Sequence, residues 1–248
     1  MLLTALALCA PQAPDYQGKF KDHANLPELI AIVEEVASDG PKELPKWLGK
    51  ERPTVTVKLV DLEEPLGRTD WPGKLPMIFS TEDQKKGWSC VISLPIDSLI
   101  RDRSLIAPAL KRQIFGVAAV RAELKSGVSV SDMGSQGLAN PFVDAMASHW
   151  AGSLDSEIDY ALLQHLESDE ALLALVTGFE EPEEGFQLTG AAEHDLTVLM
   201  FTKMVAPRND KKLGAFFEAM LHKRPFGSVL KAASGKKLDK LNQELQKF

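Results

Sequence analysis

The side chains that most often bind metals or move protons are few and scattered in this chain of 248 residues. Its five histidines are His23, His149, His165, His194 and His222. No two of them stand three or four residues apart, so no predicted helix carries a ready-made imidazole pair for zinc. Glu123, Asp144 and His149 could form a displaced metal site. Asp144 and His149 are five residues apart, however, and share a helical face poorly, so a hydrogen-bonded His149 is the alternative.

Two other common chemistries have no signature in the sequence. The serines nearest to a nucleophile elbow lie in residues 134–137, where no G-x-S-x-G is present and no strand precedes them. No glycine-rich loop follows a predicted strand, which argues against a phosphate or dinucleotide loop. The candidate chemistry therefore lies with Glu123 and its surroundings.

Two predicted helices joined by a glycine-rich loop, over residues 104–152, would position these side chains. Ser104 can cap the first helix, whose apolar residues recur at three- and four-residue steps. That repeat comprises Ile106, Leu110, Ile114 and Val117. Glycines and serines over 127–137 indicate a loop, and Pro141 suits the first turn of a second helix capped by Asn140. This arrangement can bring side chains from both helices to one point.

The spacing within this helix pair resembles the core of the gluzincin metallopeptidases, the thermolysin-like and peptidase-MA-like zinc enzymes. In that family the first helix carries HExxH and the second carries a glutamate, and together they bind Zn²⁺ with one position open. Here residues 122–126 read Ala-Glu-Leu-Lys-Ser where HExxH would fall. Ala145 falls where the glutamate would be. Ala122, Ser126 and Ala145 cannot hold zinc, and only Glu123 keeps the general-base position.

The resemblance therefore implies the fold and argues against the chemistry. We expect a catalytically inactive, metallopeptidase-like protein with no metal and no cofactor. It would either bind a peptide or protein in the vestigial cleft, with Glu123, Asp144 and His149 as binding candidates, or have a structural role. Two alternatives stay open: an active zinc peptidase with a non-standard site, and a helical scaffold unrelated to the zincins.

The remaining pattern predicts an α+β fold: a zincin-like small β-sheet and two-helix core, followed by an all-helical part. A helix over 26–37 would begin at Asn25 and end at residues 40–41, which are Gly-Pro. Strands are expected over 54–60, 77–79 and 87–94, and helical stripes over 158–166, 172–176, 191–205, 213–221, 226–232 and 238–245. We divide the chain into an N-terminal subdomain, 14–152, and a helical subdomain, 153–248. In the resembled family an edge strand borders the cleft and can pair with an extended peptide.

Charge is unevenly distributed along the chain, whose net charge is −7. Residues 155–195 hold twelve acidic and no basic side chains, whereas residues 203–248 hold eleven basic and four acidic ones. The two segments could attract each other within the fold, or one could dock a partner. The overall negative charge argues against general nucleic-acid binding.

The first thirteen residues are apolar and resemble a short secretory signal that lacks a preceding basic residue. Export and a cytoplasmic location therefore both stay open. Cys9 and Cys90 are the only cysteines, so removal of the segment would leave no intramolecular disulfide. No run of eighteen apolar residues indicates a transmembrane segment.

Overall fold

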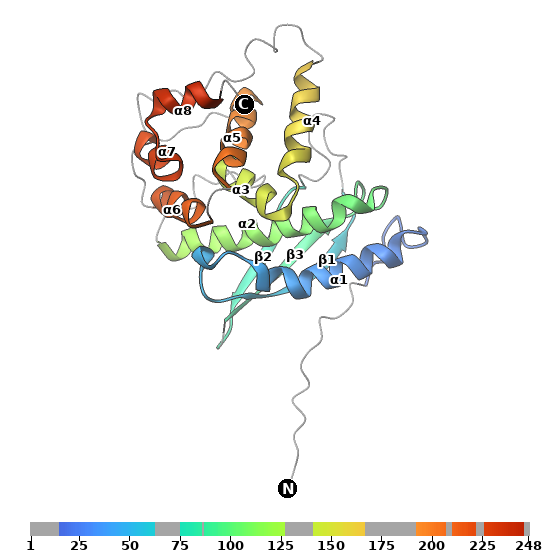
Figure 1. The fold of residues 1–248 in the computed structure, drawn as a ribbon. Coiled ribbons are helices and arrows are strands. Elements are labelled where there is room, and N and C mark those ends of the chain that lie inside the picture. Colours follow the sequence, from blue (N-terminus) through green and yellow to red (C-terminus); the bar gives the residue numbers. More distant parts are fainter. Residues whose placement is uncertain are drawn as a thin grey trace.

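The protein has an α+β fold, in which a small mixed sheet and two helices support a helical C-terminal part (Figure 1). The computed structural model describes residues 15–62, 75–85, 87–126, 141–166, 192–206, 210–221 and 226–245. Within these ranges the chain forms three strands and eight α-helices. The long helix α2 (Ile106–Ser126) lies between the sheet and the C-terminal helices.

The sheet consists of β1 (Pro53–Val60), β2 (Ile78–Asp83) and β3 (Trp88–Pro95), in the order β1-β3-β2. β1 runs parallel to β3, and β2 runs antiparallel to it. All three predicted strands are confirmed, although β2 begins one residue later and continues four residues beyond its predicted end. Val57, Ile92 and Phe79 stand opposite one another in register, on the face that is buried along β1 and β3. The side chains of β1 that alternate with the buried ones are exposed, as its β-branched alternation predicts.

Helix α1 (Leu26–Glu43) packs against β1 and α2, and it is longer than predicted. The expected stop at Gly40 and Pro41 is wrong, because the helix continues through both residues to Glu43. Pro41 lies in the last turn, where a missing backbone donor removes only one helical bond. A Cβ atom on Gly40 would lie 3.2 Å from Cδ1 of Ile114 in α2, so glycine permits the close approach of the two helices here.

Neither Ser104 nor Asn25 makes the predicted side-chain cap, although α1 does begin after Asn25, because both polar side chains have other partners. Asp102, not Ser104, caps the turn before α2: its Oδ1 accepts bonds from the Ser104 amide at 3.0 Å and the Ser104 hydroxyl at 2.6 Å. Asn25 makes no side-chain cap for α1. Its Nδ2 donates instead to the carbonyl of Ile100 at 3.0 Å, which ties the start of α1 to the segment before α2.

The C-terminal part consists of short helices stacked on α2 (Figure 1). They are α3 (Pro141–Ala151), α4 (Leu154–Leu166), α5 (Ala192–Val205), α6 (Asp210–Leu221), α7 (Phe226–Ser234) and α8 (Leu238–Leu245). The predicted start of α3 at Pro141 is confirmed, whereas Asn140 and the stripe over 172–176 lie outside the described residues. Phe142, Phe201 and Phe216 join α3, α5 and α6, with ring centroids 5.0–5.6 Å apart. No helix in the described ranges is both long and apolar enough to cross a membrane.

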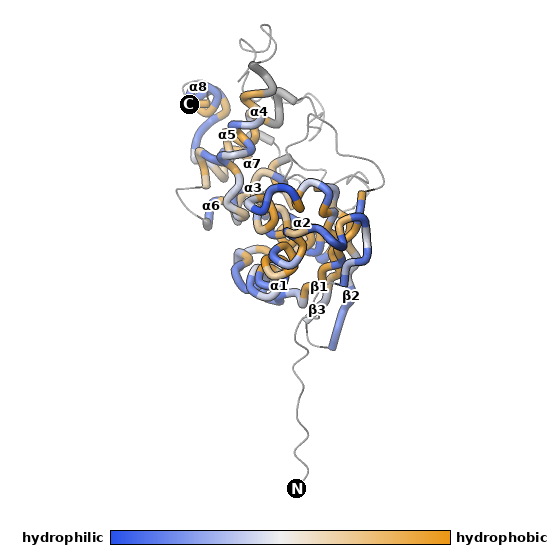
Figure 2. Tube along the Cα trace, turned by 90° about the vertical axis from the view of Figure 1, so that its right-hand side faces the viewer, coloured by the Kyte–Doolittle hydropathy of each residue, from blue (hydrophilic) through white to orange (hydrophobic). Residues whose placement is uncertain are grey.

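One hydrophobic core runs through both predicted subdomains. It extends from Tyr16 to Leu245, and Figure 2 shows hydrophobic residues gathered where α1, α2 and the strands meet. Trp47, in the N-terminal part, packs on Phe217 of α6 with ring centroids 5.3 Å apart. A Cβ atom on Gly214 of α6 would lie only 2.7 Å from the indole of Trp47, so glycine is needed for this contact. The two predicted subdomains therefore share their packing.

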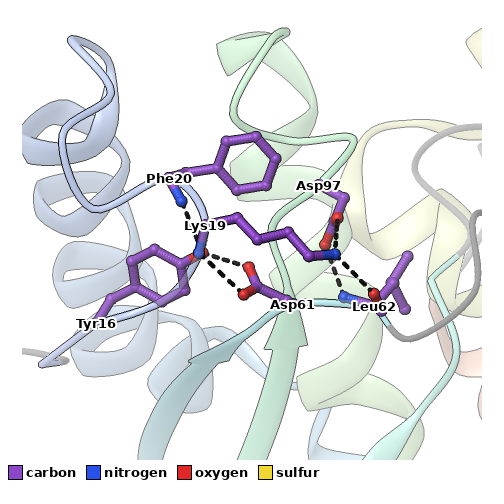
Figure 3. A network of polar contacts seen from close by, with 6 residues as sticks. All are labelled: Tyr16, Lys19, Phe20, Asp61, Leu62 and Asp97. Carbon is purple, nitrogen blue, oxygen red and sulfur yellow. Dashed lines mark hydrogen bonds and ion pairs between the residues drawn. The ribbon is translucent and has the colours of Figure 1, made fainter.

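The segment before α1 is fastened to the ends of the two parallel strands (Figure 3). The hydroxyl of Tyr16 donates to Asp61, which follows β1, and accepts the amide of Phe20 at 3.1 Å. Nζ of Lys19 donates to the carbonyl of Leu62 at 3.1 Å and lies 3.6 Å from Asp97, which follows β3. Burial alone would raise the pKa of Asp61, but the bonds from Tyr16 and the Lys19 amide lower it. Asp61 and Asp97, at the C-terminal ends of β1 and β3, therefore hold the segment before α1 in place.

Candidate functional site

The positions that the resemblance aligns with zinc ligands lie on α2 and α3, which pack against each other. The ring of Trp150 in α3 contacts Phe115 of α2, with centroids 5.9 Å apart. Ala122 follows Phe115 by two helical turns and is therefore on the same side of α2. This side of α2 is the one that faces α3.

The three positions differ in how deeply they are buried. Ala122 is half-buried and packs against the core, and Ala145 is only 1% exposed. Ser126 is exposed, and its hydroxyl donates to the carbonyl of Glu123 at 2.7 Å, within the last turn of α2. The methyl group of Ala145 is therefore part of the hydrophobic core, and a ligand could touch it only if the surrounding helices moved.

Asp144 is bound to Arg112, a residue that the sequence analysis did not select. Nη2 of Arg112 donates to Oδ1 of Asp144 at 2.5 Å, and Nη1 lies 3.4 Å from Oε2 of Glu157 in α4. Arg112 and Glu157 are only 5% and 6% exposed. Burial alone would lower the pKa of Arg112, but the two carboxylates outweigh burial and raise it. Asp144 therefore belongs to a buried ion cluster.

Ser148 completes this cluster, and Ser153 supports Ser148. The hydroxyl of Ser148 in α3 donates to Oε2 of Glu157, and the hydroxyl of Ser153 donates to the Ser148 carbonyl at 3.3 Å. The Arg112 cluster, by which we mean Arg112, Asp144, Ser148 and Glu157, thus joins α2, α3 and α4. An arginine buried within a helix requires acidic partners, so the position of Arg112 among apolar residues signals that such partners exist, although it does not say which ones.

The structure does not bring Glu123, Asp144 and His149 together as a metal site. Among the described residues, no three His, Cys, Asp or Glu side chains are grouped closely enough to hold a metal ion. Asp144 is engaged by Arg112, and His149 is half-buried in α3 with interactions of its own. The displaced metal site considered from the sequence is therefore wrong for the part of the chain that is described.

Glu123 differs from Asp144 in having no basic partner among the described residues. The two bases nearest to it in sequence bind other carboxylates: Arg121 binds Asp83 at the end of β2, and Lys125 binds Glu51 at 2.9 Å. The side chain is half-buried, and burial raises the pKa of the Glu123 carboxyl to about 7. Of the four positions that the resemblance aligns with the zinc motif, only Glu123 carries a group that could exchange a proton near neutral pH.

Arg121 connects the candidate site to the edge of the sheet. Its guanidinium carbon lies 4.6 Å from the ring centroid of Trp88, at the start of β3, while the guanidinium binds Asp83 of β2. The last turns of α2 are therefore held beside the C-terminal end of β2, where Asp83 pairs with Trp88, the first residue of β3. β2 pairs only with β3 among the described strands, so its other edge carries no strand in this part of the chain.

The charge segregation along the chain is partly balanced within the fold. Nζ of Lys203 in α5 lies 2.8 Å from Oδ1 of Asp155 in α4, which joins the basic and the acidic segment. Most of the acidic segment, residues 167–191, lies outside the described residues. One observed ion pair therefore agrees with attraction within the fold and does not test a docking role for the rest.

The site thus consists of the half-buried Glu123, the buried position Ala145 and the outer edge of β2 beside the last turns of α2; within the described ranges Glu123 has no ion-pair partner and that edge pairs with no strand. A comparison with protein-family models, curated proteins and solved structures gave no significant match.

Proposed function

We propose that this protein is a catalytically inactive relative of the gluzincin peptidases that binds an extended peptide at the open edge of β2. The proposal is supported by the antiparallel strand β2, whose outer edge pairs with no described strand, beside a helix pair whose spacing resembles that of the family, with Ala122, Ser126 and Ala145 at the places of its zinc ligands. The proposal assigns no catalytic step to the protein.

The order of elements supports the relationship. A helix, three strands and two further helices follow one another, and the antiparallel strand lies at the edge of the sheet just before the long helix. The resembled family has a small sheet with an edge strand in the same place. The pairing of Arg121 with Asp83 holds this edge beside the helix that carries Glu123.

The edge strand itself is suited to pairing with a peptide backbone. β2 has exposed side chains at five of its six positions, and Figure 2 shows it as a mostly hydrophilic strand. Its backbone groups on the free side can form ladder bonds with an added strand, while exposed alternate side chains can influence which sequence binds. Peptide binding by strand addition therefore needs no rearrangement of the sheet.

Two neighbouring proline substitutions in β2 test strand addition. Successive N–H groups point to opposite edges of a strand, so of Ser80→Pro and Thr81→Pro one removes a bond to β3 and the other blocks the free edge. Binding can be measured with a displayed library of random peptides of about ten residues. We expect the variant that keeps the wild-type melting temperature to lose binding. Unchanged binding by that variant would contradict the proposal, as would the failure of every library peptide to bind wild-type protein.

The absence of catalysis is tested by metal analysis. Purified protein, dialysed against zinc at neutral pH, should retain far less than one zinc ion per chain. A stoichiometric zinc ion, removed by chelation and restored by addition, would instead support the alternative of an active peptidase with non-standard ligands. Ala122→His with Ala145→Glu and Ser126→His rebuilds the family pattern and serves as the positive control, provided that the variant folds.

A further inference from the structure

Arg121 places a positively charged group at the C-terminal end of β2, the strand whose edge is proposed to bind a peptide. Its guanidinium carbon lies 4.6 Å from the ring centroid of Trp88, and the guanidinium donates to Oδ1 of Asp83. Asp83 and Trp88 stand opposite each other in register, so both side chains lie on the face of the sheet that packs against α2. The guanidinium therefore reaches the outermost described strand from the helix side.

This guanidinium has more donors than acceptors within the described ranges. An arginine has five N–H donors, and among the described residues the one acceptor for them is the carboxylate of Asp83, bound by Nη2. Nε is buried and has no hydrogen-bond partner in this part of the chain. The side chain of Arg121 is only 13% exposed, which limits how many of the remaining donors water can satisfy. A ligand that brings acceptors to this guanidinium would gain hydrogen bonds that Asp83 alone does not make.

Asp83 is a partner that another carboxylate can replace. Its side chain is 80% exposed, and an ion pair whose carboxylate stays in water contributes little to stability. The hydrogen bond from Arg121 lowers the pKa of Asp83, and the charges of Arg121 and Lys125 lower it further. The place therefore favours the ionised form of a carboxyl group, whether that group belongs to Asp83 or to a ligand.

We propose that Arg121 selects peptides that carry a carboxylate, which binds its guanidinium in place of Asp83. The inference rests on the proposed function and names the chemistry that the peptide must carry. A strand added to β2 would place the residue opposite Asp83 with its Cα about 5 Å away, so a carboxylate on the helix-facing side of the peptide comes within reach of Arg121. A planar guanidinium stacked on an indole can bind both oxygens of such a carboxylate.

Two parts of a peptide can supply this carboxylate. An aspartate or glutamate side chain can do so whichever way the peptide runs along the edge. A C-terminal carboxylate can do so only when the peptide runs parallel to β2, because Asp83 is the last residue of that strand. The same site can therefore read either an acidic side chain or a chain end, and the two sources are separable by experiment.

The guanidinium can be tested without knowing the peptide. The Nε–H signal of Arg121 is followed by NMR in the full-length protein, and it is assigned by its loss in Arg121→Lys. Sodium acetate is compared with sodium chloride at equal ionic strength, and acetamide serves as the uncharged analogue. We expect acetate alone to shift the signal, and to bind about threefold more tightly in Asp83→Asn, which lacks the competing carboxylate. Equal shifts in acetate and chloride would overturn the inference, as would weaker acetate binding in Asp83→Asn.

Peptides then identify the source of the carboxylate. Peptides selected from the displayed library are synthesised with each Asp or Glu changed to its amide, and with a free or an amidated C-terminus, and they are compared by calorimetry. We expect the loss of one carboxylate to weaken binding to wild-type protein by at least about tenfold. Arg121→Gln should remove this difference, while Arg101→Gln, which alters an exposed arginine before α2, should keep it.

The outcomes separate this inference from the proposed function. If Arg121→Gln lowers the melting temperature, Arg121→Lys replaces it: this variant keeps the charge but not the planar fork, and it should lose most of the preference for the carboxylate. Peptide binding that depends on no carboxylate would overturn the inference and leave the proposed function standing. An acetate effect without any peptide binding would do the reverse.

Discussion

Arg112 and Glu123 are charged residues of the same helix, eleven positions apart, but their surroundings differ. The guanidinium of Arg112 faces two carboxylates, those of Asp144 and Glu157, and both Arg112 and Glu157 are buried. Glu123 is half-buried and has no counter-charge among the described residues. A buried charge with counter-charges beside it fixes the packing of neighbouring helices, whereas a partly buried charge without one is available to a ligand. The first half of α2 is therefore structural, and its last turns are where binding is expected.

The largest effect is expected from removing the cation of the Arg112 cluster. Arg112→Met leaves Asp144 and Glu157 as buried carboxylates without a counter-charge, and this should lower the free energy of unfolding by about 3–5 kcal/mol. Urea denaturation measures the loss. Lys111→Met is the matched control, because Lys111 makes a more exposed ion pair with Glu43 and should lose less than about 1 kcal/mol. Similar losses in the two variants would mean that the cluster does not hold the helices together.

A smaller loss is expected when only the hydroxyl of the cluster is removed. Ser148→Ala deletes a buried bond to the charged Glu157, and we expect destabilisation by about 1.5–3 kcal/mol in thermal or urea unfolding. Ser153→Ala is the comparison, since its hydroxyl bonds only to a neutral carbonyl and should contribute about 1 kcal/mol. If Ser153→Ala were the more damaging substitution, the hydroxyl of Ser148 would not be supporting the charge of Glu157.

The raised pKa of Glu123 predicts a pH dependence of stability. The folded-state pKa is about 7 and the ordinary value is 4.5, so the folded protein binds this proton more tightly than the unfolded chain. The stabilisation that this tighter proton binding gives to the folded protein is fully present below pH 4.5 and is lost as the pH rises through 7. After allowance for solvent at this half-exposed group, the loss is about 1 kcal/mol. The free energy of unfolding is measured at pH 5 and pH 8, and the difference between the two values should be smaller by this amount in Glu123→Gln. An unchanged difference between the two pH values would show that Glu123 ionises normally.

The smallest effect is expected from the neighbouring surface pair. Lys125→Ala breaks an exposed ion pair with Glu51, and it should change the free energy of unfolding by less than about 0.5 kcal/mol. It should also leave the pKa of Glu123 where it is, because Lys125 does not contribute to that pKa. A rise in the NMR-measured pKa of Glu123 on this substitution would show that the positive charge of Lys125 stabilises the carboxylate.

The features that depend on local pattern were predictable from the sequence. β1 alternates buried and exposed residues, β3 alternates buried and half-buried ones, and Pro141 begins α3 as its position suggested. The helix ends were less predictable because distant contacts decide them. Asn25 has its partner at Ile100, and Gly40 stays helical where α1 approaches Ile114.

The candidate site likewise has some features that the local sequence pattern predicts and others that depend on distant contacts. Helical spacing predicted that Ala122 shares a helix side with Ser126, and the sequence singled out Glu123. The depth of Ala145 and the partner of Asp144 were not predictable, because they depend on how α2, α4 and α5 pack against α3. An ion pair such as that between Arg112 and Asp144 spans thirty-two positions, and no spacing rule within a single helix can indicate it.

The indole of Trp47, seated on the bare backbone of Gly214, has a consequence for fragments of this protein. A break in the chain near Gly152 would leave each piece with an uncovered half of a single apolar interior. Neither fragment should then remain monomeric in solution, whereas the two expressed together should reassociate. The boundary suggested by the change from strands to helices is therefore not a place where the molecule can be divided into independent modules.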